Sequence, residues 1–168
     1  MTTIANIHLD CPCCGRQFES ETVMSTNRVG MRTDFQPITL GCSYIELIVH
    51  GCPHCHFCGM HQDFKQPRLS AAVRDEILKE LVTHASDVLD AAKRYELAAL
   101  IAPQTGKNHE QTGGLYLAAA WCCRDRQLLE RERDYRTKAI TCYKRWLQEK
   151  TASNHAYSVA CQSDSSSI

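Results

Sequence analysis

The pattern of hydrophobic and polar positions changes at Pro67. Before Pro67 the apolar residues come in short runs, and Ile45, Leu47 and Val49 alternate with their neighbours in the period-two pattern of a β-strand. The segment 23–32 contains valine, threonine and methionine, so we predict that it pairs with the strand at 44–49. Residues 1–66 are therefore expected to form a small β-rich module.

After Pro67 the apolar residues follow helical spacing. Val73, Ile77 and Leu81 make one stripe, which predicts a first helix. Ser86 is a candidate N-cap for a second helix that reaches Ala99, because its hydroxyl can accept from an unpaired N–H of the first turn. The polar and glycine-containing stretch that follows this helix, residues 103–112, is predicted to be a loop.

Two further helices are expected after that loop. The third carries Leu115 and Ala119 on one side and Trp121 on another. The fourth has a clear apolar stripe, made of Tyr135, Ala139, Cys142 and Trp146 and widened by Ile140, Tyr143 and Leu147. Short connections favour two antiparallel helical hairpins, the first helix with the second and the third with the fourth. Together they predict a helical domain over 67–150.

The last segment, from Thr151 onward, is polar and loses periodicity, which predicts a disordered tail over 151–168. The predicted fold class is thus α+β, with a β module followed by a helical domain. The apolar content, 43% of the chain, is sufficient for a core. Nineteen basic residues balance nineteen acidic ones, which argues against nucleic acid or a membrane surface as the default partner.

Cysteine content is the outlying feature, with 11 in 168 residues. Residues 1–10 show no basic and apolar signal pattern, and no run approaches the roughly 18 apolar residues of a membrane span. An odd number of cysteines also fits a disulfide framework poorly. We therefore expect a reducing cytoplasmic location, no membrane partner, and thiolates that bind a metal.

Two Cys-x-x-Cys turns supply the candidate metal ligands. Cys11 and Cys14 form the first turn, and Cys52 and Cys55 form the second. Each turn brings two sulfurs to one side of the backbone, and two turns give the four soft ligands that tetrahedral zinc needs. Four cysteines close the coordination shell, so the sequence predicts one structural zinc ion and a zinc-ribbon-like module. No hydrolase, phosphate-loop or metalloprotease motif is present, and no enzymatic activity is expected.

Several alternatives remain open from the sequence. His56 stands where the first turn has Gly15, which requires a histidine to adopt a positive φ. The residues near the turns that compete as ligands are Cys13, His54, His56, Cys58 and His61. A thioredoxin-like dithiol is a second reading of each turn, although no βαβ pattern surrounds either one.

For function, the absence of a catalytic set and the helical-hairpin layout favour a non-enzymatic module that binds another protein. Nucleic-acid binding is the first alternative, because zinc ribbons often bind nucleic acids, but residues 1–66 hold four basic and six acidic side chains. Segment 124–150 is more basic and can contribute a patch. A thiol-redox or zinc-release sensor that uses the same cysteines is the second alternative.

The order of these motifs resembles a bacterial family known as a domain of unknown function, DUF2225. The resemblance rests on Cys-Pro-x-Cys-Gly followed by Phe18, the second turn at 52–55, Asp63-Phe64, and the helical segments 94–98 and 115–122. It covers residues 8–150 and implies a zinc-ribbon-like start and a tetratricopeptide-like helical end. It implies no activity. His56 stands where the family usually has a glycine, and this difference affects the expected geometry of the second turn.

Overall fold

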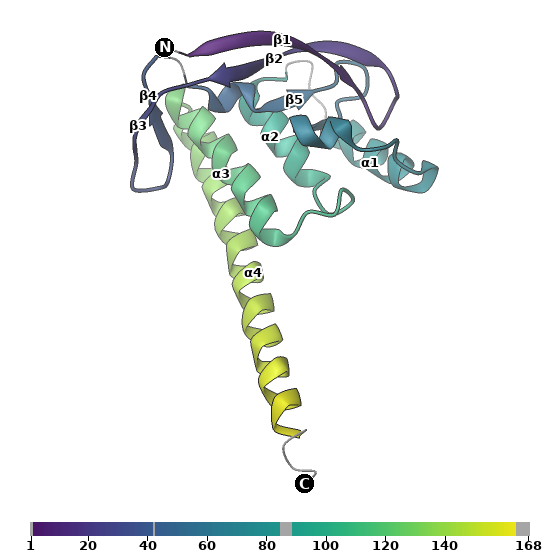
Figure 1. Cartoon of the computed structure of the whole chain (residues 1–168), viewed down its shortest axis with the longest axis vertical. Coiled ribbons are helices and arrows are strands. Elements are labelled where there is room, and N and C mark those ends of the chain that lie inside the picture. Colours follow the sequence, from purple (N-terminus) through teal and green to yellow (C-terminus); the bar gives the residue numbers. More distant parts are fainter. Residues whose placement is uncertain (1, 42, 85–88, 164–168) are drawn as a thin grey trace.

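The chain combines short antiparallel strand pairs with four α-helices, so the α+β class is confirmed (Figure 1). The structure is a computed structural model that describes residues 2–41, 43–84 and 89–163, with side chains as far as residue 152. The predicted N-cap Ser86 lies outside the described residues. No helix in the described part of the chain is long and apolar enough to cross a membrane.

The longest strand pair joins β1 (Thr3–Asp10) to β2 (Gln17–Ser25) in an antiparallel hairpin. Leu9 pairs with Phe18 in this hairpin, and both side chains are buried. The predicted pairing of 23–32 with 44–49 is therefore wrong, because the first part of that segment belongs to β2 and pairs with β1. The alternation that marks β1 runs through polar residues such as Asn6 and His8, so hydrophobicity alone does not reveal it.

Two shorter hairpins complete the strands. In the first, β3 (Arg28–Met31) pairs with β4 (Pro37–Thr39), and in the second, β5 (Val49–Gly51) pairs with β6 (Cys58–Met60). The predicted strand at 44–49 is wrong over its first half, where Ile45–Leu47 form a 3-10 helix, η1. A local turn replaces the strand because Ile45 is buried and its carbonyl accepts a 2.8 Å hydrogen bond from the buried Tyr95 hydroxyl.

The four helices are α1 (Ala71–His84), α2 (Ala91–Leu100), α3 (His109–Asp125) and α4 (Leu129–Ser163), preceded by a 3-10 helix, η2 (His61–Lys65). The predicted loop 103–112 is too long, because α3 begins at His109. Asn108 caps α3 by accepting from the Gln111 amide at 2.9 Å, while the Gln111 side chain accepts from the Asn108 amide at 3.0 Å. This reciprocal cap starts the helix earlier than its apolar residues indicate.

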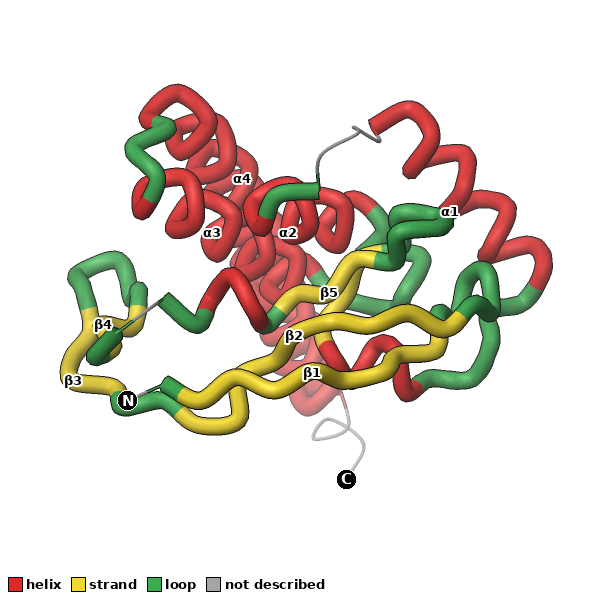
Figure 2. The backbone as a smooth tube through the Cα atoms, turned by 90° about the horizontal axis from the view of Figure 1, so that it is seen from above, coloured by secondary structure: helices red, strands yellow, loops and turns green. Residues whose placement is uncertain are grey.

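The helices do not form two separate hairpins. Figure 2 shows α2, α3 and α4 packed side by side, with α1 set apart at the opposite edge of the molecule. The predicted pairing of α3 with α4 is confirmed, whereas α1 makes little contact with α2. Along α4 the stripe residues Tyr135 and Ala139 are buried against α3 as expected, but Ile140 and Leu147 are exposed.

Helix α4 is longer than its amphipathic part. It continues past Thr151, where the sequence predicts a disordered tail, and ends at Ser163. Residues 151–163 contain no glycine or proline, so nothing in the backbone stops the helix there. The rest of the predicted tail, 164–168, lies outside the described residues. Figure 1 shows this last part of α4 extending beyond the other helices.

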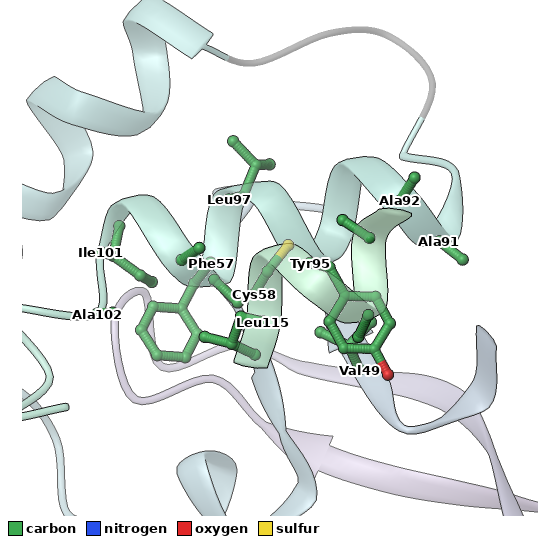
Figure 3. Close-up of a cluster of buried hydrophobic side chains, with 14 of the residues drawn as sticks. Val49, Phe57, Cys58, Ala91, Ala92, Tyr95, Leu97, Ile101, Ala102 and Leu115 are labelled. Carbon is green, nitrogen blue, oxygen red and sulfur yellow. The ribbon is translucent and has the colours of Figure 1, made fainter. Parts of the chain in front are cut away.

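One hydrophobic core joins the strands to the helices. Its buried cluster includes Cys11 and Cys52 from the β-rich part together with Tyr95 and Leu97 from α2. Figure 3 shows α2 at the centre of this core, where Phe57 lies near Ile101 and Ala102. The cluster is therefore continuous across the predicted boundary at residue 66, and the division into domains stays a prediction.

Candidate metal centre

The two Cys-x-x-Cys turns are the tips of two hairpins. Residues 11–16 connect β1 to β2, and residues 52–57 connect β5 to β6. The backbone follows one scheme in both turns: the Cys11 amide donates to the Arg16 carbonyl at 3.0 Å, and the Cys52 amide donates to the Phe57 carbonyl at 2.9 Å. Each tip therefore presents its first cysteine at the end of one strand and its second cysteine inside the turn.

A second hydrogen bond closes each tip. The Gly15 amide donates to the Cys11 carbonyl at 2.8 Å, and the His56 amide donates to the Cys52 carbonyl at 2.9 Å. Both donors have a positive φ, 72° at Gly15 and 61° at His56. The sequence-based expectation that His56 adopts the conformation of the glycine is confirmed, and the two turns have the same shape despite this substitution.

The four predicted ligands come together between the tips. The Sγ atoms of Cys11, Cys14, Cys52 and Cys55 all lie within 4.8 Å of one another. Across the two turns, Cys11 Sγ is 3.5 Å from Cys55 Sγ, and Cys14 Sγ is 3.7 Å from Cys52 Sγ. Sulfurs at the corners of a zinc tetrahedron are separated by about 3.8 Å when each Zn–S bond is about 2.3 Å long. The separations across the turns thus match a tetrathiolate site.

The protonation of these thiols depends on their neighbours. A hydrogen bond with Cys52 raises the pKa of Cys11 to about 12, and the same contact lowers the pKa of Cys52 far below its ordinary value. Hydrogen bonds with Cys11, Cys13 and Cys52 raise the pKa of Cys55 well above its usual range. Thiols this close therefore share their protons, and full deprotonation of the group requires a cation among the sulfurs.

The competing ligands do not belong to the four-sulfur group. Cys58 is buried, which raises its pKa to about 12, and its Sγ donates to the His56 carbonyl at 3.3 Å. His54 Nδ1 lies 3.4 Å from Arg16 Nη1, and His61 packs edge-on against His50 with ring centroids 6.1 Å apart. Cys13 is buried beside Cys55 but outside the group. Among the described residues, the four-sulfur group of Cys11, Cys14, Cys52 and Cys55 is the single cluster that can hold a metal.

Two sets of contacts that hold the cysteine turns in place were not predicted from the sequence. The segment after η2 crosses the first turn, where the Leu69 amide donates to the Pro12 carbonyl at 3.1 Å and Arg68 Nη2 lies 3.5 Å from the Gly15 carbonyl. Behind the second turn, His50 is 1% exposed and its Nδ1 lies 2.9 Å from Ser20 Oγ on β2. Burial lowers the pKa of His50 to about 4, so it is neutral at pH 7. These contacts link separate chain segments, and short motifs carry no signal for them.

Comparison with known proteins agrees with the sequence-based resemblance. The model of a family described as "Uncharacterized protein conserved in bacteria (DUF2225)" matches residues 4–160, which include both cysteine turns and helices α1 to α3. No curated protein and no solved structure matches the chain. Because the family match spans nearly the whole sequence, the chain belongs to the bacterial family DUF2225.

Proposed function

We propose that Cys11, Cys14, Cys52 and Cys55 hold one zinc ion, which stabilises the fold and takes no part in a reaction. The convergence of the four Sγ atoms within 4.8 Å, from two turns 38 residues apart, carries this proposal. Zinc fits the donor set best among the common metals, because four thiolates in a compact group are typical of structural zinc sites. The two hairpin tips and their shared turn geometry support a zinc-ribbon-like arrangement.

The chemistry of the group favours a structural role over a catalytic one. Catalytic zinc sites use three protein ligands and keep one position for water or substrate, whereas four cysteines would fill all positions. Four thiolates around one divalent cation leave a net charge of −2, which amide groups in each turn can partly offset. The first cysteine of each turn is almost fully buried, with Cys11 1% and Cys52 0% exposed, so these two side chains belong to the core of the fold.

We further propose that the protein is a non-enzymatic module that binds another protein through its helices. An apolar groove of about 340 Å³ supports this role; it runs along α3 and is bordered by η1. Leu115, Ala118 and Trp121 from α3 line it, together with Tyr44 and Ile45. Tyr116 lies on another face, where its ring stacks on Tyr135 of α4 at 6.5 Å. Trp121 is thus the aromatic side chain that α3 itself offers to a peptide, beside Tyr44.

Metal content of the purified protein tests the zinc proposal. We expect one zinc per chain by elemental mass spectrometry, and its loss in the double variant Cys52→Ser, Cys55→Ser. Cys58→Ser is the matched control, because Cys58 is a buried thiol next to the second turn but outside the group. Freshly reduced protein without zinc, or equal zinc loss in the control, would contradict the proposal and favour the redox reading.

The partner proposal is tested separately with Trp121→Ala. Proteins recovered with the parent chain from a bacterial lysate should be confirmed by direct binding of the purified partner, and we expect that binding to weaken in this variant. Ile140→Ala is the control, since Ile140 is exposed on α4 and does not line the groove. Zinc content is measured in parallel and should be unchanged in both. If the partner bound Trp121→Ala as tightly as the parent chain, the interface would not include the groove.

A further inference from the structure

The β3–β4 hairpin exposes an unusual amount of apolar surface. Its side chains Val29, Met31, Phe35, Ile38 and Leu40 are between 42% and 70% exposed, and Phe35 is the most exposed of them. Large apolar side chains that gather in one exposed region often mark a site of interaction. Figure 1 places this hairpin at one edge of the molecule, away from α1 and from the cysteine turns. Such a gathering within 12 residues indicates a docking surface.

Phe35, at the tip of the hairpin, is held in an unfavourable conformation. Its φ is 66°, a region that residues other than glycine, asparagine and aspartate rarely adopt. The turn is closed by the Phe35 amide, which donates to the Arg32 carbonyl at 3.0 Å, and by the Arg32 amide, which donates to the Gln36 carbonyl at 2.9 Å. Strain of this kind persists only where the surroundings impose it, and it is often found at functional sites.

The residues on either side of Phe35 provide that restraint. Asp34 accepts from Arg124 Nη1 and from Arg136 Nη2, each at 2.7 Å, so it binds both α3 and α4. Gln36 is 4% exposed; its side-chain Nε2 donates to both carboxylate oxygens of Asp125, and its side-chain Oε1 accepts from Arg124. The neighbours of Phe35 are thus fixed toward the helices, which leaves the phenyl ring directed away from them.

All exposed charged side chains of the hairpin are basic. Arg28 and Arg32 are exposed, and Arg28 Nη2 donates to the Tyr44 hydroxyl at 3.0 Å. The one carboxylate between residues 28 and 40, that of Asp34, is neutralised by Arg124 and Arg136. Within the described residues, no ion pair neutralises Arg28 or Arg32. The hairpin therefore combines apolar side chains with positive charge, which complements an anionic surface that has an apolar interior.

The apolar residues point to both faces of the hairpin. In the register, Met31 is opposite Pro37 and Gly30 is opposite Ile38, so Met31 and Ile38 lie on different faces. A flat protein interface would cover one face of such a hairpin and leave the other in water. A fluid medium, such as the boundary between lipid headgroups and acyl chains, can instead cover the exposed side chains of both faces, while Asp34 and Gln36 stay bound to the helices.

We propose that the β3–β4 hairpin docks the protein on anionic lipid bilayers, with Phe35 inserted at the tip and Arg28 and Arg32 at the headgroups. This goes beyond the proposed zinc and protein-binding roles and does not depend on either. The sequence-based expectation of no membrane partner came from the absence of a spanning segment and from the balanced net charge. Surface docking requires only a local apolar and basic site.

The test is sedimentation of the full zinc-containing chain with vesicles of phosphatidylcholine, with and without phosphatidylglycerol. We expect binding to vesicles that contain the anionic lipid, weaker binding as salt rises, and little binding to phosphatidylcholine alone. Phe35→Gly should reduce the partition coefficient at least tenfold without lowering the melting temperature, because glycine relieves the positive φ. Val82→Ser is the matched control, since Val82 is an apolar side chain on α1 that is 78% exposed.

An independent readout places the tip in the lipid. In Phe35→Trp, tryptophan fluorescence should shift to shorter wavelength when anionic vesicles are added, and the parent chain should show no comparable shift. Absence of vesicle binding, or binding that Phe35→Gly leaves unchanged, would overturn the proposal. So would a parent chain that is a dimer and that Phe35→Gly converts to a monomer, because the hairpin would then contact a second copy.

Discussion

At the scale of single residues, the two cysteine turns show how one backbone shape accepts different side chains. Gly15 and His56 occupy the same place in the two turns, and both have a positive φ. Gly15 also lies against Arg68, and a Cβ added there would be 2.4 Å from the Arg68 Nη2 atom. The backbone conformation is therefore restricted at Gly15, next to the predicted metal ligand Cys14, whereas the exposed Arg68 side chain can move aside.

Gly15→Ala should weaken both the fold and metal retention. The left-handed conformation costs an alanine about 1 kcal/mol, and a distorted turn beside Cys14 would also reduce the stabilisation from bound zinc. Gly106→Ala is the control, because Gly106 has a φ of 75° and no atom within 4 Å of an added Cβ. Urea unfolding should show a similar loss in both variants with a further loss in Gly15→Ala, and competition with a zinc chelator should show faster release in Gly15→Ala alone. Equal zinc release in both would contradict a specific role of Gly15.

At the scale of elements, Asp34 connects the β3–β4 hairpin to the helices. Burial alone would raise the pKa of Asp34, but hydrogen bonds from Arg136 and Arg124 outweigh it and hold the pKa well below the ordinary 3.8. A carboxyl group with a depressed pKa in the folded state stabilises the protein above its unfolded pKa. That stabilisation is lost as the pH falls through the folded pKa.

Asp34→Asn should therefore destabilise the protein at neutral pH by about 1–3 kcal/mol, because Arg124 and Arg136 lose their shared acceptor. The difference in unfolding free energy between the parent and this variant should shrink below about pH 4, where Asp34 of the unfolded chain becomes protonated. Asp75→Asn is the control, since the Asp75 side chain is 57% exposed and pairs with the adjacent Arg74. Urea unfolding across pH measures both, and a difference that is independent of pH would contradict the role of the charge.

The elements also show what the sequence can predict and why the rest escapes it. Helical stripes such as Ile77 with Leu81, and Tyr135 with Ala139, are predictable because each helix buries the same face at every turn. The strand predicted over Ile45 is wrong because the Ile45 carbonyl accepts a hydrogen bond from Tyr95, 50 residues later, and this distant contact overrides a local strand pattern. The cluster of four cysteines is predictable from spacing, since each turn is a local structure. Gln36 and Asp34 gave no such signal, because their partners lie near residue 125 and beyond.

At the scale of the whole molecule, the four-cysteine cluster and the helices share one core. Cys11 and Cys52 belong to the same buried cluster as Tyr95 and Leu97 of α2. Arg94 Nη2 also donates to the Glu46 carbonyl at 2.7 Å, which ties α2 to η1. A continuous core is expected to unfold in one cooperative step, so loss of the proposed zinc ion should also destabilise the helices.

Removal of zinc by a chelator should therefore lower the melting temperature recorded from the helical circular dichroism signal. At free zinc about 1,000-fold above the Kd, binding adds about 4 kcal/mol to stability, which is roughly 8–16 °C in a chain of this length. The zinc-free Cys52→Ser, Cys55→Ser variant should melt at the lower temperature with or without the chelator. If the helical signal of the parent kept its melting temperature while near-ultraviolet signals changed, residues 67–150 would fold independently of the cysteine turns. The continuous core favours the first outcome, because α2 would lose buried contacts with Phe57 and Cys58 once the second turn unfolds.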